Sequence, residues 1–212
     1  MRITKIERQK KHPTRKSVFI DGRFAFGVSD EVLLTSSLHE GVELEEADLQ
    51  KILRREDEES AKQKSLRFLS IRPRSVKEMR DYLRRKEYAE EIAASVIAEL
   101  KTLKLLDDVS FARMVCRDTL AKKPAGEKLL RSILFKKGVQ KTDIDAILPE
   151  FFTSASELEM ALQAAERQQM RAKRSSKFVD DLHAEKKLLD YLVRRGFTFE
   201  TALNATKQIL SK

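Results

Sequence analysis

Residues 82–88 read YLRRKEY, residues 133–139 read ILFKKGV and residues 191–197 read YLVRRGF. Each of these three copies runs from an apolar pair into basic residues, then into Gly in two copies or Glu in the first, and then into another apolar residue. The first copy has Glu87 where the others have Gly138 and Gly196. The leucine of the phrase returns after 51 residues and again after 58 residues, which is the spacing of a structural repeat.

The chemistry of the phrase is that of a helix end. Lys and Arg in a last turn interact favourably with the negative end of the helix dipole, and Gly after it adopts the left-handed conformation that closes the helix. Apolar residues recur at helical spacing on both sides of each copy. The sequence therefore predicts a mainly α fold of tandem, stacked three-helix repeats.

The residues before the repeats predict a small α+β head. Asp21-Gly22 lies between two strand-like runs and is a strong hairpin signal, and residues 3–8 form a weaker candidate for an edge strand. Phe24, Phe26 and Val28 alternate along the second run, so we expect them on one face that helices must cover. We expect module boundaries that give residues 1–58 to the head and residues 59–106, 107–153 and 154–212 to repeats one, two and three.

Further helix signals lie between these landmarks. Ser29 is expected to be an N-cap, and a later helix is expected from about Glu46. Capping boxes are predicted at Ser75–Glu78 and Ser154–Glu157, and Asp108 is predicted to cap the helix after it. The acidic run at 56–59 is either a solvated helix face or a module boundary. Residues 171–176 form a basic stretch that we expect to be a flexible joint.

Charge is distributed unevenly along the chain. Residues 1–60 hold 11 basic and 13 acidic side chains, whereas residues 61–212 hold 32 basic and 21 acidic side chains, for a total of +9. A basic array behind a slightly acidic head favours a polyanionic partner, either nucleic acid or a protein bound to it. The lone Cys116 indicates a reducing compartment, and no apolar run approaches the roughly 20 residues of a membrane span. We expect a cytoplasmic protein with no membrane contact.

The sequence contains no pattern that predicts catalysis. His12, His39 and His183 are scattered without metal-ligand spacing, so we expect no zinc site. Neither a phosphate-binding glycine loop nor a nucleophile elbow occurs. We expect no enzymatic activity, no cofactor and no bound metal.

Several segments together resemble the RecX family of regulatory proteins, bacterial modulators of the RecA recombinase. The resemblance covers essentially the whole chain and includes ITKI at 3–6, VFIDGRFAFGV at 18–28, SVKEM at 75–79, LLDDVSFA at 105–112 and the second and third copies of the phrase. It implies an elongated, curved array of three-helix repeats. It also implies binding in the groove of the RecA–DNA filament and suppression of the recombinase and ATPase activities. We expect the protein to be a monomer. Glu87 departs from the glycine usual in the family, so the first helix stop should be less tight.

Basic residues of the repeats are the candidates for contact with this filament or with DNA. They are Arg84, Arg85, Lys86, Lys136, Lys137, Arg171, Lys173, Arg174, Arg194 and Arg195. Two interpretations remain open, because a basic residue at a helix end is also favoured by the dipole alone. An alternative function is a stand-alone nucleic-acid binder. The sequence shows no aromatic platform among basic residues, so such binding would be non-specific and strongly salt-dependent.

Overall fold

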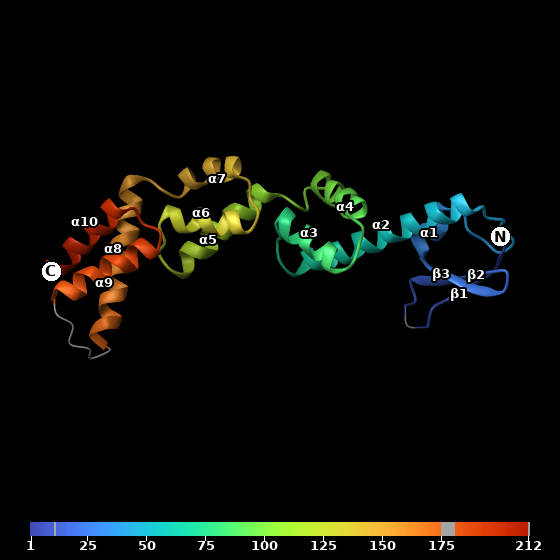
Figure 1. Ribbon diagram of the computed structural model, residues 1–212, viewed down its shortest axis with the longest axis horizontal. Coiled ribbons are helices and arrows are strands. Elements are labelled where there is room, and N and C mark those ends of the chain that lie inside the picture. Colours follow the sequence, from blue (N-terminus) through green and yellow to red (C-terminus); the bar gives the residue numbers. More distant parts are fainter. Residues whose placement is uncertain (11, 175–180, 212) are drawn as a thin grey trace. The chain divides into compact units, whose positions relative to one another are not determined.

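The computed structural model describes residues 1–10, 12–174 and 181–211, except for the side chains of residues 154, 172–174 and 181–183. Within these residues the chain is mostly helical and carries one three-stranded sheet at its N-terminal end (Figure 1), as the sequence predicts. It divides into two compact units. The first contains Met1–Pro73 and Met79–Leu106, and the second contains Arg74–Glu78 and Asp107–Lys212.

The head of the first unit is an antiparallel sheet of β1 (Ile3–Arg8), β2 (Arg15–Ile20) and β3 (Arg23–Ser29), in that order. Asp21 and Gly22 join β2 to β3 with φ angles of 49° and 80°, as a hairpin turn with two left-handed residues requires. Both the predicted hairpin and the predicted edge strand are confirmed. Helices α1 (Asp30–Thr35) and α2 (Glu46–Ile71) complete the head core. That core buries Ile3, Val18, Phe26, Val28, Val32, Leu38, Leu44 and Ile52.

The face predicted for Phe24 is wrong, because β3 contains a bulge. Val18 pairs with Phe26, but Phe19 pairs with Phe24, which leaves Ala25 as an extra residue. An extra residue moves the side chains beyond it to the other face of a strand. Phe24 is therefore 60% exposed, whereas Phe26 is 7% exposed and lies in the core.

The remaining helices follow the predicted pattern. After α2 come α3 (Val76–Arg85) and α4 (Glu90–Thr102). They are followed by α5 (Asp108–Lys122), α6 (Glu127–Lys136), α7 (Lys141–Ile147) and a 3₁₀ turn, η1 (Leu148–Glu150). The chain ends with α8 (Ser154–Arg174), α9 (Asp181–Arg194) and α10 (Phe199–Leu210). The boundary expected at 58/59 falls inside α2, which is one continuous helix.

Two predicted helix caps are displaced by one residue. Asp107, not Asp108, caps α5 by accepting the Val109 N–H at 2.9 Å, while Asp108 accepts the N–H of Val76 at the start of α3. At α8 the reciprocal cap joins Thr153 and Ser156, since each hydroxyl accepts the other residue's N–H. The caps predicted at Ser29 and Ser75 are confirmed, because their hydroxyls accept the N–H groups of Val32 and Glu78.

All three copies of the repeated phrase end a helix as predicted. The residues after the ends of α3, α6 and α9 have left-handed φ angles of 63° at Glu87, 84° at Gly138 and 88° at Gly196. In each copy the next N–H donates back to the leucine carbonyl, as Val139 does to Leu134 at 3.1 Å and Phe197 to Leu192 at 3.3 Å. This is the Schellman arrangement, in which an apolar contact accompanies the hydrogen bonds. Leu134 and Val139 accordingly share one core cluster of the second unit, and Leu192 and Phe197 share another.

Candidate partner-binding surface

The repeated helix end places its basic residues at two kinds of position. We call the first the outward position, which is held by Arg85, Lys136 and Arg194. We call the next one the docking position, which is held by Lys86, Lys137 and Arg195. All three outward residues are exposed, whereas Lys137 and Arg195 are only partly exposed. The ten basic candidates therefore do not form one uniform class.

The second copy uses its docking residue to hold the start of α3. Lys137 Nζ lies 3.1 Å from Glu78 Oε1 and 5.5 Å from the centre of the Phe111 ring. The Lys137 carbonyl accepts a 2.6 Å hydrogen bond from the Ser75 hydroxyl, and the Lys136 carbonyl accepts one from Lys77 Nζ at 3.2 Å. All these residues belong to the second unit. Lys137 is thus committed to an internal contact, while the Lys136 side chain stays exposed.

The third copy repeats this arrangement at the start of α6. Arg195 donates from Nε to the Pro124 carbonyl at 3.0 Å and from Nη2 to the Lys123 carbonyl at 3.1 Å. In return, the Arg195 carbonyl accepts the N–H of Gly126 at 3.0 Å. The Gly196 carbonyl accepts the N–H of Lys128 at 3.1 Å. The end of one helix therefore satisfies the free N–H groups at the beginning of another.

The basic residues of the first copy have only local contacts among the described residues. Arg84 forms an ion pair of 2.7 Å with Asp81 and keeps 73% of its side chain exposed. Arg85 Nε donates to the Asp81 carbonyl at 3.2 Å, and Lys86 Nζ lies 5.9 Å from the centre of the Tyr82 ring. Arg84, Arg85 and Lys86 are all exposed, so this copy offers a solvent-facing basic cluster.

The basic stretch at 171–176 is only partly described. Arg171 is exposed and lies in α8, which continues to Arg174. The expected flexible joint is therefore wrong for residues 171–174, which are helical. The side chains of Lys173 and Arg174, and residues 175–176 altogether, lie outside the described residues.

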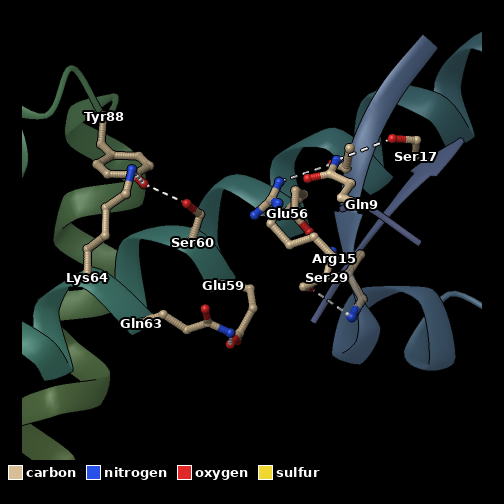
Figure 2. A network of polar contacts seen from close by, with 12 residues as sticks. Gln9, Arg15, Ser17, Ser29, Glu56, Glu59, Ser60, Gln63, Lys64 and Tyr88 are labelled. Atoms are coloured by element: carbon tan, nitrogen blue, oxygen red, sulfur yellow. Dashed lines mark hydrogen bonds and ion pairs between the residues drawn. The ribbon is translucent and has the colours of Figure 1, made fainter. Parts of the chain in front are cut away.

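Glu56 is a buried polar residue, although the acidic run at 56–59 is expected to be a solvated helix face or a module boundary. It is 6% exposed, and its Oε2 accepts the Ser29 N–H at 2.7 Å while its Oε1 lies 2.6 Å from Arg15 Nη1. Figure 2 shows this network joining α2 to the sheet. Farther along α2, the Tyr88 hydroxyl lies 2.8 Å from the Ser60 hydroxyl and accepts a 2.7 Å bond from Lys64. Burial every three to four residues along α2 was the signal that could have identified Glu56.

The described residues show neither a metal-ligand cluster nor a reactive cysteine. They contain no group of three or more His, Cys, Asp or Glu side chains that could hold a metal ion. Cys116 is buried, and burial raises the pKa of its thiol to about 11, so it stays protonated and unreactive at neutral pH. No helix in the described part of the chain is both long and apolar enough to cross a membrane.

A groove between α6 and α7 was not anticipated. It has a volume of about 380 Å³ and is lined by Lys128, Arg131, Ser132, Phe135, Lys141 and Ile144. Phe135, which lines the groove, is 70% exposed. The sequence shows this phenylalanine between Leu134 and Lys136 but does not indicate which way it faces.

Comparison with known proteins identifies the family. Residues 1–45 match the family model described as the regulatory protein RecX N-terminal domain, and residues 61–100 match the model of the RecX first three-helix domain. A protein named regulatory protein RecX from Listeria monocytogenes serovar 1/2a is 30% identical over all of this chain and 77% of its own length. Another protein of that name, from Bacillus licheniformis, is 32% identical over 97% of this chain and 76% of its own length.

Solved structures agree with this assignment. A crystal structure of regulatory protein RecX matches with a TM-score of 0.75 and 27% identity, over 94% of this chain and 96% of the other. A structure of RecX from Lactobacillus salivarius shares the fold, with a TM-score of 0.63 and 23% identity over 73% of this chain and 97% of the other. The chain belongs to the RecX family of regulatory proteins.

Proposed function

We propose that this protein binds the RecA recombinase on its DNA filament, as a monomer in the cytoplasm, and inhibits its recombinase and ATPase activities. It would thereby modulate recombination and DNA repair without catalysing a reaction itself. Family membership supports a regulatory role, since relatives along the whole chain are named regulatory proteins. RecA is the proposed partner because the chain resembles the RecX family, which consists of modulators of RecA.

One structural observation carries the proposed mode of binding. Among the basic candidates, the outward position recurs as exposed Arg85, Lys136 and Arg194 at the same point of each helix end. The docking position is used internally in two copies, by Lys137 and Arg195. An exposed cation that recurs with each repeat suits a partner whose negative charges also recur, and a nucleoprotein filament is such a partner.

The proposal is tested by the DNA-dependent ATPase of RecA, measured with and without this protein at several DNA concentrations. We expect inhibition that persists when DNA is in excess, because the filament itself is the target. If added DNA alone restores full ATPase activity, the protein acts by sequestering DNA. The stand-alone nucleic-acid binder would then be the correct function, and filament regulation would be wrong.

A further inference from the structure

The groove between α6 and α7 combines an apolar wall with a basic rim. Phe135, 70% exposed, and Ile144, 1% exposed, both line it. Val193 and Arg84 hold the equivalent positions in the other two helix ends, so an aromatic side chain occurs here only in the second copy. Burying this ring under a ligand would remove apolar surface from water.

The charges at the rim differ in their availability. Arg131 is held by Glu127 at 2.8 Å and by Asp145, so its charge is already compensated. Lys128 and Lys141 are exposed, and neither forms an ion pair with a residue that the structure describes. The groove therefore offers an aromatic face with uncompensated cations on α6 and at the start of α7.

This arrangement matches the alternation of bases and phosphates in a single nucleic-acid strand. A base stacks on an aromatic ring whatever its identity, because every base has a π-face, and the phosphates on either side of it attract lysines. A duplex hides the faces of its bases in the stack, so it cannot use an exposed phenyl ring in this way. An acidic peptide with one apolar side chain is the other ligand of suitable chemistry, but it lacks a planar group that requires an aromatic partner.

We propose that the α6–α7 groove binds single-stranded nucleic acid, with one base stacked on Phe135 and neighbouring phosphates paired with Lys128 and Lys141. This inference rests on the proposed function, which brings the protein to DNA. It adds the site at which the protein would contact the DNA strand. It also revises the expectation that no aromatic side chain lies among basic residues. The sequence hides this site because Lys128 and Lys141 join Phe135 only through the packing of α6 against α7.

The test uses the full chain without RecA and a fluorescein-labelled oligothymidylate, with binding followed by fluorescence anisotropy. Phe135→Leu keeps an apolar side chain but removes the ring. We expect it to weaken binding roughly 5- to 100-fold, which is the range for loss of one stacking partner. Phe199→Leu is the matched control, since Phe199 is 62% exposed in the same unit but lies in α10, and it should bind as the parent does.

Salt dependence tests the phosphate contacts. Lys141→Gln should weaken binding and reduce the slope of log K against log salt by about 0.7, the value for one phosphate contact on a single strand. Equal binding by Phe135→Leu and the parent, or no binding of oligothymidylate by the parent, would overturn the proposal. So would an acidic, leucine-containing peptide that binds in a Phe135-dependent way while the oligothymidylate does not. Because RecA is absent, these outcomes are independent of the ATPase test of filament regulation.

Discussion

The helix end at Glu87 and the helix ends at Gly138 and Gly196 share one hydrogen-bond pattern but differ in their surroundings. A Cβ added at Gly138 would lie 2.4 Å from the Lys77 Cβ, and one added at Gly196 would lie 2.2 Å from the Leu129 nitrogen. Glu87 carries a side chain in the same left-handed conformation and is exposed. Positions 138 and 196 therefore require glycine both for the left-handed backbone conformation and because another residue packs against them. Position 87 requires only a residue that can adopt the left-handed conformation.

This difference explains why the basic residues divide as they do. Where a helix end packs against another helix start, the docking residue is used for that contact, as Lys137 and Arg195 are. Where it does not, as at Glu87, all the basic side chains stay in solvent. A charge that recurs in the sequence can thus have an internal role in one copy and remain available to a partner in another.

The largest effect is expected for Gly196→Ala. The change combines an unfavourable left-handed conformation with a backbone clash, so we expect a loss of roughly 3 kcal/mol or more in the free energy of unfolding. Gly22→Ala is the matched control, because Gly22 has a φ of 80° and nothing within 4 Å of the added Cβ. It should cost about 1 kcal/mol. Equal losses in urea unfolding would show that close packing contributes nothing at Gly196.

A smaller loss is expected for Arg195→Gln, which removes charged donors from the carbonyls of Lys123 and Pro124. We expect a cost of about 1–2 kcal/mol, since part of the side chain remains in water. The neighbouring Arg194→Gln should change stability by less than about 0.5 kcal/mol, as exposed substitutions usually do. Thermal unfolding of the two variants side by side measures the difference, and a reversed order would contradict the division into outward and docking positions.

Glu87→Gly should stabilise the protein. Glycine adopts a φ of 63° without the steric cost borne by a residue with a Cβ, so a gain of about 0.5–1 kcal/mol is expected. Glu87→Ala retains the Cβ and should give no such gain. Urea unfolding of both variants separates backbone strain from loss of the Glu87 charge, and equal stabilisation by Ala and Gly would identify charge as the cause.

The smallest effect concerns Glu157, which lies near the junction of the third helix end with α6. Burial raises the pKa of the Glu157 carboxyl, and the negative charge of Glu127 raises it further. A hydrogen bond from the Thr198 N–H lowers this pKa but does not cancel the rise. The native state therefore holds this proton more tightly than the unfolded chain does. The resulting stability is present at acidic pH and is lost as the pH rises through the raised pKa. Glu157→Gln should thus match the parent at acidic pH and be slightly more stable at neutral pH, and a pH-independent difference in unfolding midpoint would contradict this.

Local signals in the sequence predict much of this fold. The Asp21-Gly22 turn, the Ser29 and Ser75 caps and the three helix ends depend on residues within one turn of each other, and all are confirmed. Those signals are short-range because the relevant hydrogen bonds close within a few residues. The α2 helix was also anticipated from its start near Glu46.

What the sequence does not predict depends on contacts between distant segments. Phe24 changes face because of one extra residue in β3, and Glu56 is buried because Arg15 and Ser29 meet it across the head. Asp108 caps α3 instead of its own helix, across 32 residues of sequence. The roles of Lys136 and Lys137 likewise separate only when the start of α3 is brought against them, so the phrase alone cannot distinguish the two.

The measurement that tests this account most directly is RecA ATPase inhibition by a variant carrying Arg85→Glu, Lys136→Glu and Arg194→Glu. The matched control is Lys101→Glu, because Lys101 is also exposed in the last turn of a helix, α4, but lies outside the repeated phrase. Each substitution should cost about 0.3–1 kcal/mol through the helix dipole and leave the fold intact. We expect the triple variant to lose inhibition, with a weaker dependence of any remaining inhibition on salt, while Lys101→Glu inhibits as the parent does. Full inhibition by a folded triple variant would contradict the claim that the outward basic residues contact the filament.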